Sequence, residues 1–308
     1  MTGRTVLHIG GAKTASTTLQ TAVLLQASTI HHFGEGGDGV TGPDDERIIR
    51  SLLNDDAYLC DYSEVESLFR RHRKLAGGAT FVFSSADVLL ANQPTVAAAR
   101  LRALLGADTD VLLVVRNQLS ALLSLYSGHG AWLKPAPAPY FRHFVSFQNW
   151  LELQWLDPST SALASFAYWE QLQPFIAAFG REQVKVVPFE RLVLGDKQTW
   201  ATVADLLGLE SQLAWQLFSA DRRRERISLW QKRYGHVASV LRPFSSVPDI
   251  RRTGGPLTSL LARGPRFVPK WPTGMETRIR THYGPGNSVL NGEFALGLAE
   301  FGYPMGSK

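Results

Sequence analysis

The chain has 308 residues, of which 44% are hydrophobic and 19% are charged, and it contains a single cysteine. This composition is typical of a globular protein and excludes a disordered, collagen-like or coiled-coil chain, and one cysteine excludes an internal disulfide. The net charge is +5, but the segment from Arg222 to Arg280 alone holds 14 basic and 3 acidic side chains, so the basic charge is concentrated toward the C-terminus.

This charge distribution narrows the possible partners. A basic segment either attracts polyanions or is a solvated surface. No nucleic-acid-binding motif accompanies it, so we expect no nucleic-acid partner. No run of 18 apolar residues and no secretion signal stands out in the sequence, which predicts a cytoplasmic protein without a membrane span.

Short apolar runs alternate with helical patterns along the chain. The expected strands are residues 6–9, 80–83, 111–115 and 184–187, and the helical patterns after them are residues 17–25, 87 onward, 119–126 and 199–207. Long loops are expected at residues 31–39, 128–139 and 245–272. This order predicts a single α/β domain over residues 1–308, with a central parallel sheet flanked by helices. Ligands of such sheets bind beyond the carboxyl ends of the strands.

The residues after the first strand have the composition of a phosphate-binding loop. Gly10, Gly11 and Ala12 leave room for an anion beside the backbone N–H groups, and a helix beginning near Ser16 directs its positive end toward it. Lys13 adds a positive charge, and hydroxyl donors follow at Thr14, Ser16, Thr17 and Thr18. The glycines of a Walker A motif are missing, which disfavours an ATPase or GTPase.

A second candidate anion-binding group follows the strand at residues 111–115. Arg116 stands at the carboxyl end of that strand, and Ser124 lies eight residues further on, about two helical turns away. A buried guanidinium needs an anionic partner. From these residues alone, a ligand anion and a structural carboxylate are equally good partners.

Together these segments resemble the sulfotransferases that use 3′-phosphoadenosine 5′-phosphosulfate (PAPS). Residues 13–18 (KTASTT) are similar to the family's 5′-phosphosulfate loop, and Arg116 with Ser124 and Tyr126 is similar to its 3′-phosphate motif. Residues 187–192 (VPFERL), 206–209 (LLGL) and 301–304 (FGYP) resemble further family segments. The likeness extends over nearly the whole chain.

The resemblance implies a P-loop NTPase-like fold and transfer of a sulfuryl group from PAPS, with release of PAP and without a metal. It assigns Lys13 to the leaving phosphate oxygen. It assigns the donor site to two groups of residues, which are Lys13, Thr14, Ala15, Ser16, Thr17 and Thr18 around the 5′-phosphate and Arg116, Ser124 and Arg226 around the 3′-phosphate. The basic part from about residue 222 is expected to cover the donor and acceptor sites.

Two positions depart from the family pattern. Ala15 replaces the usual glycine, which requires a negative φ at this position. Ala86 stands where many relatives have a glutamate that acts as general base. The candidates for that base are Asp87, His31 and His129, together with His32 beside His31. The competing interpretations are a first-turn carboxylate at a helix N-terminus capped by Ser85 for Asp87, and a surface position for the histidines.

The sequence leaves the acceptor open. An aromatic stretch (Trp132, Tyr140, Phe141, Phe144, Phe147 and Trp150) either lines an apolar pocket or belongs to the core. A small molecule, a glycan, a lipid and a peptide are all possible acceptors. Two alternative functions are a non-catalytic PAPS- or PAP-binding protein that has lost its base and, less favoured, a nucleotide kinase.

Overall fold

The computed structural model describes residues 3–34, 42–91, 93–128, 145–220, 228–241 and 256–306. The chain divides into two compact units. The first, here called the sheet unit, is Met1–Asn117, Ala164–Arg222 and Arg280–Lys308, and the second unit is Gln118–Leu163 and Arg223–Ile279. The boundary therefore crosses helix α14 (Met275–Phe294).

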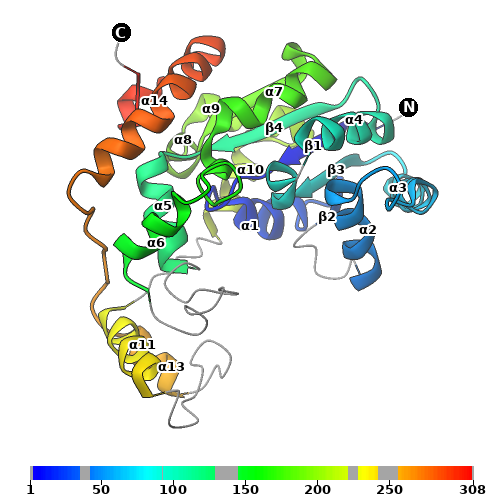
Figure 1. Cartoon of the computed structure of the whole chain (residues 1–308). Helices are drawn as coiled ribbons and strands as arrows, with labels where there is room; N and C mark the ends of the chain where they lie inside the picture. The colour runs from blue at the N-terminus through cyan, green and yellow to red at the C-terminus, as the bar shows by residue number, and fades with distance from the viewer. Residues whose placement is uncertain are drawn as a thin grey trace. The chain divides into compact units, whose positions relative to one another are not determined.

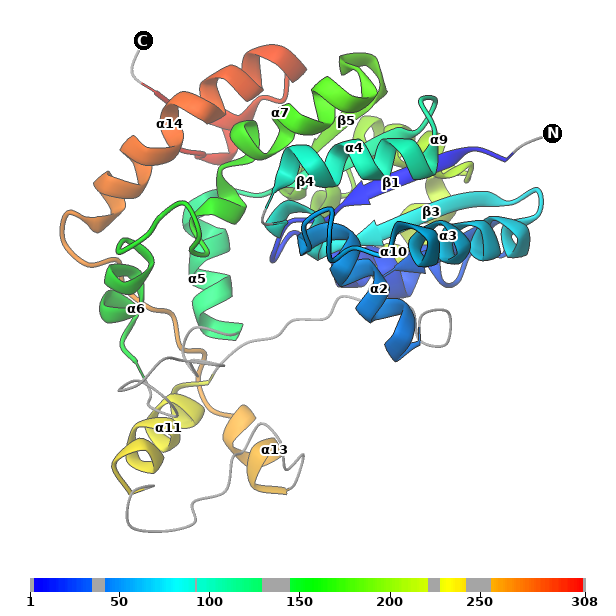
Figure 2. The same ribbon diagram turned by 45° about the vertical axis from the view of Figure 1, so that its right-hand side comes forward.

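The sheet unit is built on five parallel strands, as Figures 1 and 2 show. In the order in which they pair, these are β2 (Ile30–Gly34), β3 (Thr80–Ser85), β1 (Thr5–Ile9), β4 (Asp110–Val115) and β5 (Val184–Pro188). Four of them lie at the predicted positions, and the predicted α/β class with a central parallel sheet flanked by helices is confirmed.

Strand β2 corrects the sequence analysis, which assigned residues 31–39 to a loop. Ile30–Gly34 pairs in register with Thr80–Ser84 as the edge strand. It ends at Gly34, whose φ is 126°, and a Cβ at that position would lie only 2.1 Å from Ser84 O. This strand was missed because two histidines follow Ile30, which hides the apolar pattern of a short edge strand.

One face of the sheet packs against a π-helical segment, Leu19–Leu24, and helices α9 (Lys197–Leu207) and α10 (Ser211–Ala220). The π-helical segment continues the single turn α1 (Ser16–Thr18), in agreement with the helix predicted over residues 17–25. The short helix α8 (Phe189–Leu194) follows β5. Side chains of Val6, Val82 and Leu112 form the sheet side of this core, and Trp200 and Phe218 are the large residues opposite.

Helices α3 (Tyr62–Ala76), α4 (Pro94–Leu105) and α7 (Tyr168–Phe179) lie on the other face. Phe69 of α3 packs edge-on against Phe33 of β2 and also contacts Phe83 of β3. Helix α3 begins where Asp61 accepts from the backbone N–H groups of Ser63 and Glu64. Helix α2 (Pro43–Asn54) precedes α3, and short 3₁₀ turns complete the unit at Ala86–Leu90, Ala164–Phe166, Arg181–Gln183 and Leu298–Phe301.

The described part of the second unit is mainly helical, with α5 (Gln118–Gly128), α6 (Phe147–Gln154), α11 (Leu229–Leu241) and α13 (Pro256–Ala262). Helix α13 lies within the loop expected at residues 245–272 and corrects that expectation. Phe147 and Trp150 are buried against Tyr126, so these two aromatic residues belong to a core; Trp132, Tyr140, Phe141 and Phe144 lie outside the described residues.

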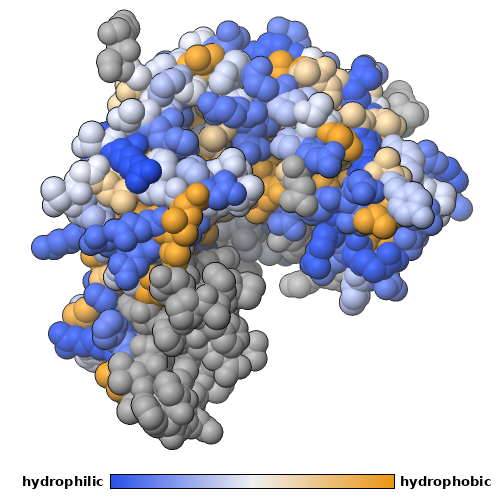
Figure 3. Space-filling view, in the orientation of Figure 1, coloured by the Kyte–Doolittle hydropathy of each residue, from blue (hydrophilic) through white to orange (hydrophobic). Residues whose placement is uncertain are grey.

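The surface in view in Figure 3 is mostly hydrophilic where the structure describes it, with hydrophobic residues scattered singly or in small groups. Within the described residues, no helix is long and apolar enough to cross a membrane.

Candidate functional site

The loop after β1, residues 10–16, is the predicted phosphate-binding loop and is here called the anion loop. It places two non-glycine residues in the left-handed region of backbone conformation. Lys13 has φ 63° and Ala15 has φ 65°. The expected negative φ at Ala15 is therefore wrong. Ala15 is the residue directly before α1 (Ser16–Thr18), so the left-handed conformation lies where the loop enters the helix. Such a conformation costs about 1–2 kcal/mol for a residue with a Cβ, and strain of this kind is concentrated at ligand-binding sites.

Two of the predicted hydroxyl donors hold the loop together from inside. Thr14 Oγ1 donates to Gly11 O at 2.7 Å, and Ser16 Oγ donates to the same oxygen at 3.3 Å. Both side chains are buried, as is Thr18, whereas Thr17 is exposed. Thr14 and Ser16 therefore shape the loop, and Thr17 is the hydroxyl that faces solvent at the beginning of the helix.

The structure brings Arg116 to this loop, although the two segments are about 100 residues apart in the chain. Arg116 Nη1 donates to Lys13 O at 2.7 Å, and the guanidinium carbon lies 4.4 Å from the ring centre of Phe189. Burial lowers the pKa of Arg116, and the negative charge of Glu190 opposes that effect. The guanidinium of Arg116 therefore lies against the backbone of the loop after β1.

The backbone around Arg116 is held by groups from distant elements. The N–H of Arg116 donates to the Tyr168 hydroxyl at 3.1 Å, and that hydroxyl donates to Arg116 O at 3.0 Å. The N–H of Asn117 donates to Glu190 Oε1 at 3.1 Å, and its side-chain amide donates to Phe301 O at 2.9 Å. The segments 187–192 and 301–304 singled out in the sequence therefore support the Arg116 turn.

A buried polar cluster lies beneath the anion loop. His8 Nδ1 is 2.7 Å from Ser84 Oγ, which also accepts from Gln20 Nε2 at 2.9 Å. His8 and His32 are 1% and 3% exposed, and burial lowers their pKa values to about 3 and about 4. Both imidazoles are therefore neutral at pH 7. No sequence signal indicates the link of His8 to Ser84 and Gln20.

The candidate bases occupy different places. Asp87 is exposed in the first turn of the 3₁₀ helix Ala86–Leu90. Its N–H donates to Ser85 Oγ at 3.2 Å, so Ser85 caps this helix. His31 lies on the opposite face of β2 from His32, with Nε2 3.2 Å from His72 Nδ1. His129 lies outside the described residues.

Two further residues of the predicted donor site are not brought together with Arg116 by the described structure. Ser124 lies on α5, which belongs to the second unit, so its place beside Arg116 stays a prediction. Arg226 and the rest of the run Arg222–Arg226 lie outside the described residues.

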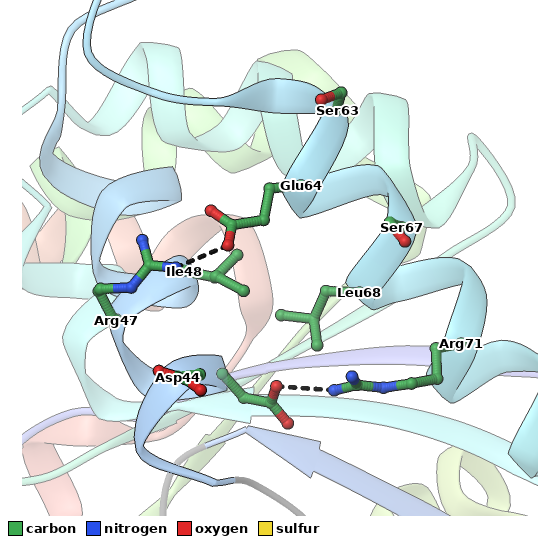
Figure 4. A pocket seen from close by; sticks show the side chains of 9 residues that line it. Asp44, Arg47, Ile48, Ser63, Glu64, Ser67, Leu68 and Arg71 are labelled. Carbon is green, nitrogen blue, oxygen red and sulfur yellow. Dashed lines mark hydrogen bonds and ion pairs between the residues drawn. The ribbon is translucent and has the colours of Figure 1, made fainter.

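A groove of about 560 Å³ lies between α2 and α3, and no residue of the anion loop lines it. Figure 4 shows that both of its arginines pair with carboxylates. Arg47 Nη2 lies 2.6 Å from Glu64 Oε1, and Arg71 Nη2 lies 2.6 Å from Asp45 Oδ1. Among the residues that the structure describes, no cluster of three or more histidine, cysteine or acidic side chains is arranged to hold a metal ion.

Comparison with known proteins adds to this picture at the level of the fold. No family model and no curated protein matches the sequence. A solved sulfotransferase from Alicyclobacillus acidocaldarius superimposes with a TM-score of 0.57 over 97% of this chain and 99% of its own, at 16% identity. Two other solved structures have lower TM-scores. The sulfotransferase domain from the curacin biosynthetic pathway has a TM-score of 0.44 and 13% identity, over 98% of this chain and 99% of its own. A retinol dehydratase solved in complex with androsterone and the inactive cofactor PAP has a TM-score of 0.40 and 13% identity, over 94% of this chain and 80% of its own. The chain has a sulfotransferase fold, as the resemblance implied.

Proposed function

We propose that the chain is a sulfotransferase that moves a sulfuryl group from PAPS to a hydroxyl or amine of an acceptor and releases PAP. The observation that carries the proposal is the contact between Arg116 and the backbone of Lys13. It joins a strained, glycine-rich loop at the carboxyl end of one strand to a cation at the end of the neighbouring strand. A nucleotide with phosphates at both the 5′ and 3′ positions needs two such anion-binding groups.

In the proposed reaction the bond between sulfur and the 5′-phosphate oxygen breaks, and a bond between sulfur and the acceptor oxygen or nitrogen forms. The electron pair stays on the phosphate oxygen, where Lys13 offsets the developing charge. The acceptor proton passes to a base. This chemistry depends on positioning and charge stabilisation, and we propose that it proceeds without a metal.

The donor site in this proposal consists of the loop residues Lys13, Thr14, Ala15, Ser16, Thr17 and Thr18, with Arg116, Ser124 and Arg226 around the 3′-phosphate. Thr14 and Ser16 contribute by fixing the loop, because their hydroxyls bind Gly11 O. The acceptor is a small molecule, a glycan, a lipid or a peptide.

Asp87, His31 and His129 remain the proposed candidates for the base. Ala86 and the position of Asp87 in the first turn of a helix capped by Ser85 favour a second function, in which the chain binds PAPS or PAP without catalysis. Replacing Asp87 by alanine separates these: lost turnover with unchanged PAP binding supports Asp87 as base. Unchanged turnover removes Asp87, and no turnover by the wild type on any acceptor favours the binding protein.

The first experiment is a thermal-shift comparison of PAP, adenosine 5′-phosphate, and ATP with magnesium. A ligand at 100 times its Kd stabilises the native state by about 2.7 kcal/mol. We expect the largest shift with PAP. A shift with ATP and magnesium alone would indicate a nucleotide kinase, and no shift with any of the three would contradict a donor site.

A further inference from the structure

The chain near the C-terminus reaches the Arg116 turn through a half-buried carboxylate, that of Glu190. Glu190 Oε1 accepts from the N–H of Asn117 at 3.1 Å, and Glu190 Oε2 accepts from the Tyr303 hydroxyl at 2.7 Å. One carboxylate therefore joins the end of β4 to residue 303, with one donor on each of its oxygens.

Tyr303 is well placed to be a fixed donor in this arrangement. It is 3% exposed, and burial raises the pKa of its hydroxyl, which therefore keeps its proton. The following residues are anchored on α14, where Asn287 Nδ2 donates to Pro304 O at 2.8 Å and Ser288 Oγ accepts from the N–H of Gly306 at 2.9 Å. The tyrosine ring is thus held by the backbone on its C-terminal side.

The position of Glu190 matters because its charge acts on Arg116. The carboxylate is the main group that opposes the effect of burial on the Arg116 guanidinium. While Asn117 and Tyr303 bind its two oxygens, Arg116 Nη1 donates to Lys13 O in the anion loop. Without the Tyr303 hydroxyl, Oε2 loses its donor and becomes a stronger acceptor for the nearby guanidinium. The carboxylate then competes with a ligand phosphate for Arg116.

We propose that Tyr303 and Glu190 are positioning residues that direct Arg116 toward the 3′-phosphate, so that preference for a 3′-phosphorylated nucleotide depends on the Tyr303 hydroxyl. This inference rests on the proposed function, since it concerns the preference for PAP over adenosine 5′-phosphate. The two nucleotides differ only in the 3′-phosphate, so their affinity ratio isolates the action of Arg116 from the stability of the fold.

The test is calorimetric titration of PAP and adenosine 5′-phosphate into the wild type and Tyr303→Phe. We expect Tyr303→Phe to weaken PAP binding about tenfold, which is about 1.4 kcal/mol, while the affinity for adenosine 5′-phosphate stays the same. The matched control is Tyr62→Phe, which also removes one tyrosine hydroxyl, the donor to Arg100 O at 3.5 Å between α3 and α4. It should lower stability and leave the affinity ratio unchanged.

The outcomes separate the inference from the proposed function. If the wild type prefers PAP and Tyr303→Phe keeps the full preference, the inference is overturned and the proposed function stands. A wild type without any preference for PAP overturns both. If Tyr303→Phe does not fold, Glu190→Gln is the second variant. A glutamine has only one acceptor oxygen, so either the Asn117 N–H or the Tyr303 hydroxyl loses its acceptor. A preference for PAP equal to that of the wild type in Glu190→Gln also overturns the inference.

Discussion

The turns at the carboxyl ends of β1 and β4 differ in what holds them. The anion loop after β1 is shaped by its own residues, since the hydroxyls of Thr14 and Ser16 bind a carbonyl within the same loop and the backbone accepts two left-handed residues. The Arg116 turn after β4 is held by Tyr168, Glu190 and the chain near residue 301. The first turn carries local strain, and the second depends on distant packing. Substitutions should therefore affect the two turns differently.

The largest effect is expected at Lys13, on the locally built turn. Lys13→Ala should lower kcat by about 10²–10³-fold, because a charge that stabilises the leaving oxygen is lost while the loop conformation remains. Steady-state sulfuryl transfer from PAPS measures this. Lys74→Ala on the exposed side of α3 is the control and should keep wild-type turnover. Wild-type turnover in Lys13→Ala would contradict the assignment to the leaving oxygen.

The buried histidines beneath the anion loop predict acid sensitivity. The pKa of His32 falls from 6.5 in the unfolded chain to about 4 in the native state, and that of His8 to about 3. Below pH 6.5 the unfolded chain takes up protons that the native state does not, so stability is complete above pH 6.5 and is lost as the pH falls toward 4. His32 alone contributes a loss of about 3 kcal/mol.

Denaturant unfolding at pH 7 and pH 4.5 measures this loss. His32→Asn should lower stability at pH 7 and reduce the difference between the two pH values. His236→Asn, at an exposed histidine on α11, should leave that difference as in the wild type. Equal pH dependence in all three proteins would mean that His32 is not buried as a neutral group.

Arg116 lies in the turn that residues distant in sequence hold in place. Arg116→Ala should weaken PAP binding by about 30- to 100-fold, because a charge-assisted contact to a phosphate is lost. Binding of adenosine 5′-phosphate should change much less. Calorimetric titration of both nucleotides gives the answer, and the Lys74→Ala variant again is the control. Equal losses for both nucleotides would assign Arg116 to the structure of the loop through its bond to Lys13 O.

The smallest effect concerns the strain in the anion loop. Ala15→Gly should stabilise the protein by at most about 1 kcal/mol, because glycine adopts φ 65° without a steric penalty while the lost methyl contacts and the freer unfolded chain offset part of the gain. Ala204→Gly is the matched control at a buried right-handed position in α9. It should destabilise by about 1 kcal/mol or more. Thermal unfolding of the two variants and the wild type measures both effects. If Ala15→Gly destabilised the protein as much as Ala204→Gly does, the backbone at Ala15 would not be strained.

The sequence alone was sufficient for the features that depend on neighbouring residues. Four strands, the helix after β1 and the composition of the anion loop follow from hydrophobic period and from small and hydroxyl-bearing residues next to each other. The edge strand β2 was missed, because two histidines interrupt its apolar pattern, and the burial of His32 by other elements has no sequence signal. The left-handed conformation of Ala15 was also missed, because a side chain of one methyl group does not reveal its φ.

Only the tertiary structure decided which distant residues contact one another. Arg116 reaches Lys13 because β1 and β4 are adjacent in the sheet, and Tyr303 reaches Asn117 through Glu190 because α8 and the chain near its C-terminus meet at the end of β4. Sequence spacing carries no information on such contacts. They arise from the order of strands in the sheet and from the packing of buried side chains, both of which are properties of the whole chain.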